Sequence, residues 1–232
     1  MATTKPVSEG VFQTVLENYI VSQARTVEAS VNRGLRALLE RNERLASEVF
    51  LTEPRINEME ILIDEHAIRM LRQGNLSDTD VRLIVATLKI NNDLERMGDL
   101  AVNITQRALS LMREPPVKPL IDIPQMATLA EEMVRKSLDA LVKRDEDLAR
   151  SVLLSDDEVD RLRDAVYKEL VAFMQEQSTT IPRAVDLMFI AHNLERVADH
   201  ATNIAEDVLF LVKGIDVRHH SEVREHSLLS NK

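Results

Sequence analysis

The sequence predicts an all-α protein made of two tandem three-helix bundles that are related by an internal duplication. Three observations predict this fold. A segment near residue 95 recurs one hundred residues later, prolines gather in the middle of the chain, and there are only five glycines and 3% aromatic residues in 232. The remaining composition is rich in Ala, Leu, Glu, Arg and Met, which are good helix formers.

The clearest repeat pairs residues 94–104 with residues 194–204. These read LERMGDLAVNI and LERVADHATNI, and seven of the eleven positions are identical. A second match pairs residues 37–46 with residues 140–149 at an offset of 103 instead of 100, so the first half carries three extra residues between its matching blocks. Two bundles explain both matches more simply than the alternative, which is one irregular six-helix domain.

The domain boundaries follow from the prolines. Four of the seven lie between Pro115 and Pro124, and proline blocks the continuation of a helix, so residues 114–121 are expected to link the halves. We therefore predict a first bundle over residues 1–116, a second bundle over residues 117–215, and a polar, mobile C-terminal tail over residues 216–232.

Three helices are expected in the first half. The first covers residues 8–49. Pro54, in the run Thr-Glu-Pro, predicts the start of a second helix because proline suits a first helical turn, and Gly74 predicts its end. Ser77 or Asp78 is expected to open the third helix, which continues to about Arg113.

Three helices are also expected in the second half. Asp122 with Pro124 predicts the start of a helix that ends near Leu154. The run of residues 155–158, Ser-Asp-Asp-Glu, has a capping-box pattern. The run of residues 180–182, Thr-Ile-Pro, opens the last helix, and Gly214 closes it.

Composition excludes several classes of function. There are no cysteines, which excludes disulfides, thiolate metal sites and cysteine nucleophiles, and no glycine-rich phosphate loop occurs. The net charge is -10, so nucleic acid is an unfavourable partner. No apolar run reaches the ~20 residues of a membrane span, and the N-terminus lacks a signal-peptide core. A cytoplasmic location is expected.

The repeated segments place Glu, Asp and Asn at i, i+4 and i+8, on one face of each helix. We call these two sets the acidic ladders. The first consists of Glu95, Asp99 and Asn103, and the second consists of Glu195, Asp199 and Asn203. At about 100° per residue the apolar stripe of each helix lies on the opposite side, so both ladders are predicted to face away from the core. Hard oxygen ligands favour Mg²⁺, Mn²⁺ or iron over zinc.

Outward carboxylates ordinarily form only a solvated surface. Against that reading, neither Glu95 nor Glu195 has Lys or Arg at i±3 or i±4, although Glu and Asp at i, i+4 repel. The first ladder's face also continues into apolar Val81, Val85 and Leu88, and the arrangement occurs twice. The residues alone leave a metal site, a partner surface and an inert surface open.

Four more carboxylates show the ladder spacing and could complete a metal shell, but spacing alone does not assign them. They are Glu60, Asp64, Asp160 and Asp164. His192 shares the second ladder's face, whereas His200 points away from it, and both are interpreted as surface or interface histidines.

Catalytic residues are not expected. No Glu-x-x-His pair occurs, which disfavours a ferritin-like di-iron enzyme, and no Gly-x-Ser-x-Gly elbow occurs. Outward carboxylates also experience little desolvation, which makes them weak general acids. The alternative hypothesis is a metal-dependent enzyme that uses multinuclear carboxylate sites.

The ladders, the two-bundle layout and the closing segment of residues 201–219 together resemble the PhoU family. The resemblance implies a cytoplasmic negative regulator of phosphate uptake and of the phosphate-starvation response. It implies an adaptor that contacts the ATPase subunit of a phosphate ABC transporter (Pst) and a PhoR-type sensor histidine kinase. It further implies a homodimer, and a divalent or multinuclear metal (Mg, Mn, Fe or Zn) on the ladders. Because the ladders are anionic, phosphate itself is expected to be sensed elsewhere.

Overall fold

The computed structural model describes residues 9–115 and 122–217, and these ranges are helical apart from short connections. Seven α-helices and one short 3-10 helix form the described fold. They are α1 (Glu9–Glu40), α2 (Glu43–Gln73), α3 (Asp78–Met112), α4 (Asp122–Lys143), α5 (Glu146–Leu153), α6 (Asp156–Glu176), η1 (Ser178–Thr180) and α7 (Ile181–Lys213).

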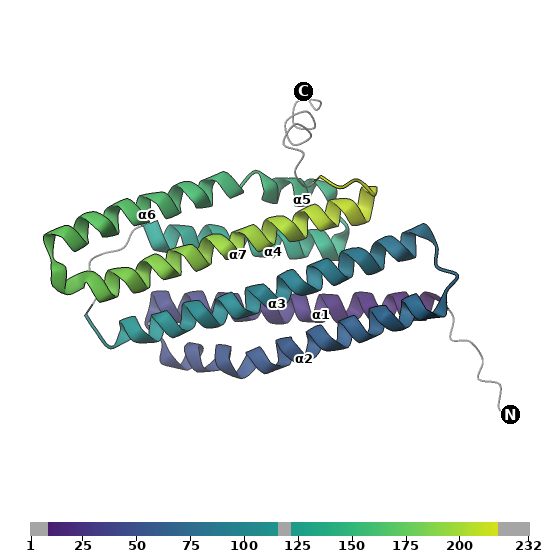
Figure 1. The fold of residues 1–232 in the computed structure, drawn as a ribbon, viewed down its shortest axis with the longest axis horizontal. Helices are drawn as coiled ribbons and strands as arrows, with labels where there is room; N and C mark the ends of the chain where they lie inside the picture. The colour runs from purple at the N-terminus through teal and green to yellow at the C-terminus, as the bar shows by residue number, and fades with distance from the viewer. Residues whose placement is uncertain (1–8, 116–121, 218–232) are drawn as a thin grey trace, which may run out of the picture.

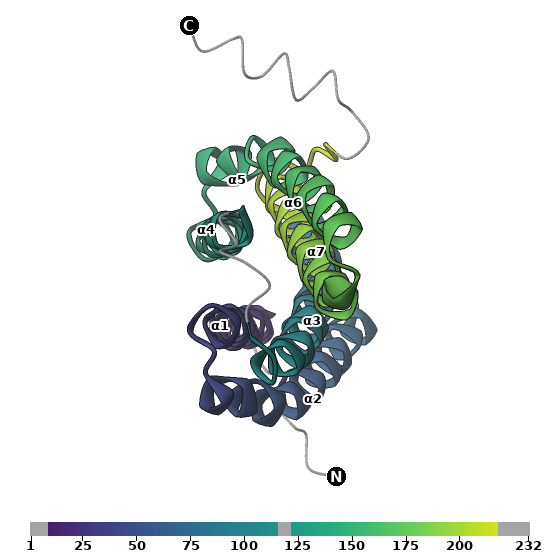
Figure 2. The same cartoon turned by 90° about the vertical axis from the view of Figure 1, so that its left-hand side faces the viewer.

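Two three-helix bundles lie side by side. The first contains α1, α2 and α3, and in the second α5 and α6 together take the place of α2 (Figure 1). Seen from the end, α3 and α7 are neighbours at the centre, α1 lies beside α4, and α2 and α6 flank the central pair (Figure 2). The prediction of two tandem three-helix bundles is confirmed.

The duplication is visible in which residues are buried. Every buried position of α4 except Leu141 corresponds to a buried residue of α1 at an offset of 103, as Val27 and Ala130 illustrate. Between α3 and α7 the offset is 100, as Leu94 and Leu194 illustrate. The three extra residues of the first half therefore change the loops and leave both core registers intact.

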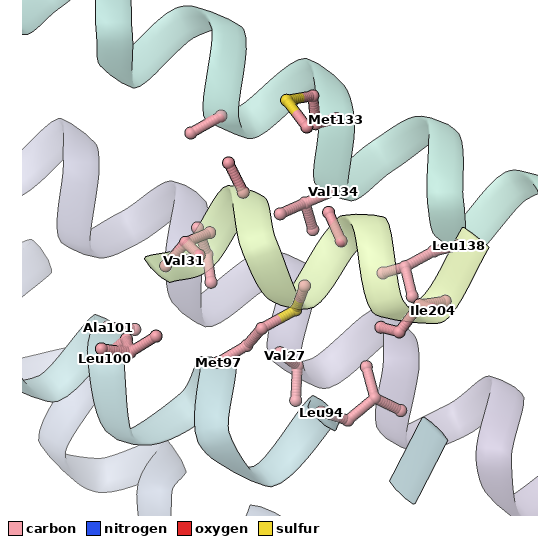
Figure 3. Close-up of a cluster of buried hydrophobic side chains, with 14 of the residues drawn as sticks. Val27, Val31, Leu94, Met97, Leu100, Ala101, Met133, Val134, Leu138 and Ile204 are labelled. Carbon is pink, nitrogen blue, oxygen red and sulfur yellow. The ribbon is translucent and has the colours of Figure 1, made fainter. Parts of the chain in front are cut away.

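The hydrophobic core runs through both bundles without interruption. In Figure 3, Val27 of α1 and Met97 of α3 lie close to Val134 of α4 and Ile204 of α7. Each of these side chains is at most 1% exposed. Fully burying such a side chain stabilises the fold by roughly 1.5–3 kcal/mol, so α1 and α3 hold the first bundle against the second.

The first helix ends nine residues earlier than the last predicted position, 49. It stops at Glu40, and Arg41 adopts a left-handed φ of 52° before Asn42 caps α2. Pro54, predicted to open a helix, lies inside α2 with an exposed side chain. Neighbouring helices support α2 on both sides of this proline, so tertiary packing outweighs the lost backbone hydrogen bond.

The second half repeats that turn. The helix predicted to end near Leu154 stops at Lys143, Arg144 has φ 51°, and Asp145 caps α5. In both halves the residue after the arginine donates its backbone N–H five residues back, to Ala37 or Ala140, at 3.0 Å. The sequence match at offset 103 therefore marks a turn, whereas we predicted continuous helix there.

Most predicted helix ends are confirmed. Ser77 and Asp80 form a capping box at the start of α3, Gly74 follows α2, and Gly214 ends α7 in the left-handed conformation. The capping box predicted at Ser155 is wrong, because its hydroxyl donates to the Ser151 carbonyl at 3.2 Å instead of accepting from the next turn.

The linker and the tail are only partly described. Residues 116–121 of the predicted linker and residues 218–232 of the predicted tail lie outside the described residues. Val217, at the start of that tail, is only 5% exposed and packs on the core. Across the described ranges, no helix has an apolar stretch long enough to cross a membrane.

Candidate functional site: two acidic helix faces

Both ladders lie on the sides of α3 and α7 that face away from the core, as predicted. Asn103, Asp199 and Asn203 are exposed. The two glutamates are less open, because α2 and α6 pack beside them: the side chain of Glu95 is 17% exposed and that of Glu195 is 15% exposed. The glutamate at the start of each ladder is therefore partly covered by the neighbouring helix.

In the first bundle, α2 brings two more carboxylates to the ladder. Asn91 is 1% exposed, and its side-chain amide donates to the Asp64 carboxylate at 2.9 Å and to the Glu60 carbonyl at 3.0 Å. This pair of bonds fixes α3 against α2. We call the resulting set of Glu60, Asp64, Glu95 and Asp99 the first acidic face.

The carboxylates of the first acidic face repel one another. Burial raises the pKa of Glu95, and Asp99 and Glu60 raise it further, whereas Arg96 lowers it. Burial also raises the pKa of Glu60, with Asp64 and Asp99 adding to the effect. Arg96 lies beside this face, with its Nε 3.6 Å from Glu95 Oε2. This face would gain from an added cation.

The second bundle contains its own cation. Arg163 of α6 donates to Glu195 at 2.7 Å, and its guanidinium lies 3.3 Å from Asp160 and 3.0 Å from Asp164. We call Asp156, Asp160, Asp164, Glu195 and Asp199, together with Arg163, the second acidic face. This arginine offsets part of the negative charge that the first face leaves uncompensated.

Arg163 does not compensate every carboxylate of the second acidic face. Glu195 Oε2 is buried and makes no hydrogen bond within the described ranges, although His192 Nδ1 lies 3.2 Å away. Partial burial, then Glu195, Asp156 and Asp160, raise the pKa of Asp199 to about 6. The expectation that outward carboxylates experience little desolvation is wrong here, because α6 covers part of the face.

The histidine expectations are confirmed. His192 lies on the ladder face beside Glu195, and His200 points to the interface between the bundles. There its Nδ1 lies 2.7 Å from Asp93 of α3, and the Asn203 amide donates to the same carboxylate at 3.1 Å. The last residue of the second ladder therefore also ties α7 to α3.

Glu60, Asp64, Asp160 and Asp164 had the right spacing but were not assigned, and Asp156 and Arg163 were missed. The short connection between Gln73 and Asp78 could have predicted that Glu60 lies near the first ladder. A short loop makes α2 and α3 antiparallel neighbours, which sets Glu60 opposite Glu95 at a similar distance from the turn.

These faces suit a hard divalent cation by donor chemistry, since carboxylate and amide oxygens are its preferred ligands. Within the described ranges, however, no three carboxylate or imidazole groups converge in an arrangement ready to hold one ion. A cation would have to draw the side chains of a face together. Burial is the main cause of the raised pKa values of Glu60 and Glu95, and neighbouring carboxylates raise them further; that second contribution is the repulsion that such a cation would relieve.

Comparison with known proteins agrees with this geometry. The family model of the PhoU domain matches twice, over residues 20–108 and 123–208, once for each bundle. The chain belongs to the PhoU family. Both family matches include the ladder of their half, so the duplicated unit defined by the family carries each acidic face.

Individual relatives cover most of the chain. A phosphate-specific transport system accessory protein PhoU homolog of Pseudomonas aeruginosa is 36% identical over 205 residues, which is 88% of this chain and 85% of the relative. The namesake of Aquifex aeolicus is 38% identical over 200 residues, 86% of this chain and 90% of the relative.

Solved structures share the fold. The crystal structure of PhoU from Pseudomonas aeruginosa matches with a TM-score of 0.86 and 34% identity, covering 90% of this chain and all of that one. The phosphate transport system regulatory protein PhoU from Streptococcus pneumoniae matches with a TM-score of 0.81 and 25% identity, covering 90% of this chain and 99% of that one.

Proposed function

We propose that this protein is a cytoplasmic, non-catalytic accessory protein of a phosphate transport system that represses the phosphate-starvation response. The observation that carries the proposal is the similarity over 86–88% of the chain to relatives that are named accessory proteins of phosphate-specific transport. Its partners are the ATPase subunit of the phosphate ABC transporter and a PhoR-type sensor histidine kinase, and it acts as a homodimer.

The experiment is deletion and complementation in the organism that encodes the protein. Deletion should derepress phosphate-starvation genes in phosphate-rich medium, and the wild-type gene should restore repression. An Asp99→Ala, Asp199→Ala double variant should restore it poorly. A matched control is Glu65→Ala with Glu176→Ala, which removes one exposed carboxylate from each half outside the ladders. Unchanged expression after deletion refutes the proposal.

Partner contacts need a separate test. Purified protein should co-elute with the transporter ATPase subunit or with the kinase's cytoplasmic part, and light scattering should give twice the mass of 26.3 kDa for the free protein. Failure to bind either partner would leave repression without the adaptor mechanism, and a monomeric mass would remove the homodimer.

We further propose that the ladders hold a divalent or multinuclear metal through Glu95, Asp99 and Asn103 in the first half and Glu195, Asp199 and Asn203 in the second. Glu60 and Asp64 are placed to complete the first set. A bound cation would supply positive charge to faces whose carboxylates repel one another. The donors favour Mg, Mn or Fe over Zn.

Elemental analysis of protein purified without chelators tests the metal. Metal in the wild type that disappears from the Asp99→Ala, Asp199→Ala variant places it on the ladders. If the Glu65→Ala, Glu176→Ala control loses metal equally, or if the wild type carries none after incubation with Mn²⁺ and Fe²⁺, the ladders instead act as a docking surface for a basic partner.

A further inference from the structure

A polar groove with a volume of about 550 Å³ lies between α1 and α2, away from the ladder residues. Three arginines line it: Arg25 and Arg33 from α1 and Arg55 from α2. The rest of the lining is uncharged, with no carboxylate among the residues that form it. We call this feature the arginine groove. A concentration of guanidinium groups is unusual in a chain whose net charge is -10.

Two of the three arginines have no carboxylate partner in the described parts of the chain. Arg33 pairs with Glu48 at 3.2 Å, whereas Arg25 and Arg55 are exposed and form no such pair. Elsewhere on α1, Arg36 pairs with Glu40 at 2.8 Å. The groove therefore presents positive charge to solvent, in contrast to the paired arginine farther along the same helix.

The duplication supplies an internal comparison. At the offset of 103 that aligns α1 with α4 and α2 with α5 and α6, Arg25 corresponds to Thr128 and Arg55 to Glu158. Arg33 corresponds to Lys136, whose ammonium group is paired with Glu132 at 2.7 Å. Arg33 and Lys136 are thus both paired, whereas the second bundle lacks the two unpaired arginines, so their presence is not a by-product of the shared fold.

The groove is also elongated. A second cleft of about 400 Å³ adjoins it and shares Arg25, Ala29 and Arg33, but Glu28, Glu48 and Glu131 also line that cleft, so it is not part of the arginine groove. The arginine groove itself follows α1 from Asn18 to Arg33, which at 1.5 Å per residue is roughly 22 Å. This length greatly exceeds a single oxyanion but matches about seven residues of extended chain at ~3.3 Å each.

We propose that the arginine groove docks an extended acidic segment of a partner protein, with carboxylates placed on Arg25 and Arg55. Charge complementarity and length both favour this occupant over a free oxyanion. Guanidinium groups bind carboxylates through paired hydrogen bonds, and a positive surface on an acidic protein orients an acidic partner during encounter. The proposal rests on the groove alone and does not depend on metal at the ladders.

The probe is a fluorescein-labelled peptide of eight glutamates, compared with eight glutamines, in an anisotropy titration of the full-length protein at low salt. The glutamate peptide should bind, and the Arg25→Gln, Arg55→Gln variant should weaken it by about tenfold, since two exposed ion pairs contribute up to ~1 kcal/mol each. The matched control is Arg69→Gln with Arg72→Gln, two exposed arginines on α2 outside the groove.

The control variant has the same net charge and should bind the peptide within about twofold of wild type. Equal weakening in both variants would show nonspecific attraction and overturn the proposal, as would no binding of the glutamate peptide. Binding of inorganic phosphate that requires Arg25 and Arg55, without binding of the peptide, would also overturn it in favour of a small-oxyanion site. Circular dichroism confirms that each variant is folded.

Discussion

Glu60 in the first bundle and Arg163 in the second occupy equivalent positions of the duplicated fold. The buried residues around them, such as Ile63 and Val166, align at the same offset of 103. Glu60 adds negative charge to the first acidic face, whereas Arg163 donates to Glu195 at 2.7 Å. The two bundles thus share a core, but the equivalent residue beside the ladder is acidic in the first and basic in the second. An added cation would therefore relieve more repulsion at the first face than at the second.

The largest expected effect tests that difference through Mn²⁺ binding by calorimetry. Glu60→Arg should place a guanidinium beside Glu95 and weaken Mn²⁺ binding at the first face by about 10–100-fold, because neighbours of metal ligands commonly contribute that much. Arg163→Glu should strengthen binding at the second face, because it replaces a guanidinium beside Glu195 with a carboxylate at the position equivalent to Glu60.

The control for this charge reversal is Arg161→Glu, which makes the same charge change at an exposed position on α6. It should leave both binding steps nearly unchanged. If Glu60→Arg has no effect on the isotherm, the first face does not bind the ion, and the contrast between Glu60 and Arg163 concerns stability only.

A second contrast lies inside the bundles. Gln23 of α1 is 1% exposed, and neither polar atom of its side-chain amide has a hydrogen-bond partner among the described residues. Its counterpart in α4 is Met126. Gln23→Met removes a buried, unsatisfied amide with little change of volume. It should raise the free energy of unfolding by about 1–2 kcal/mol in urea titrations.

The reverse substitution, Met126→Gln, should lower the free energy of unfolding by a similar or larger amount. If Gln23→Met is destabilising, the amide has a stabilising role that the described contacts do not include. Either result shows whether the duplicated core is still interchangeable between its two copies.

The sequence predicted the helices and the duplication better than the turns and the contacts between helices. Helix class, the pairing of the halves and the outward ladders follow from a period near 3.6 and from a repeat, both of which can be read without knowing how the helices pack. The turn at Arg41 was missed because no glycine or proline marks it, although Asn42 is a good cap. Arginine in a left-handed conformation carries almost no signal of its own.

The site was predicted only as far as single helices allow. Glu95 and Glu195 could be placed on a face, but their partners come from α2 and α6, 35 and 32 residues away in sequence. The register between helices decides that Glu60 lies beside the first ladder and Arg163 beside the second, and packing sets that register. Packing also buries part of each face and so raises the pKa values of Glu95 and Asp199, which helix periodicity alone does not predict.

Protonation distinguishes the faces further. The pKa of Asp199 is about 6 in the folded protein, against ~3.9 for an unfolded chain. Between these pH values Asp199 is ionised in the unfolded chain but keeps its proton in the folded protein. The contribution of protonated Asp199 to the free energy of unfolding is therefore fully present below about pH 4 and is lost as the pH rises through about 6. Asparagine resembles the protonated carboxyl and keeps this form at every pH.

Asp199→Asn should therefore raise the melting temperature at pH 7.5 in the presence of EDTA and leave it unchanged at pH 4. The Asp199 side chain is only partly buried, so solvent screens part of the repulsion and the gain should not exceed ~2 °C. Asp157→Asn, an exposed position near the start of α6, is the control. A gain that is equal at both pH values would contradict the assignment.

The smallest expected effect concerns the two turns that share a left-handed arginine. Arg144 forms a surface ion pair with half-buried Glu17, which contributes little, so Arg144→Gly should relieve backbone strain and raise the free energy of unfolding by up to ~0.5 kcal/mol. Arg41 instead donates to the carbonyls of Leu111, Met112 and Glu114 at the end of α3, at 2.7–3.1 Å. Losing these bonds makes Arg41→Gly destabilising by about 1 kcal/mol. Urea titrations that gave both variants the same sign would mean that backbone strain alone decides the outcome, and that Arg41 does not hold α3 to the α1–α2 turn.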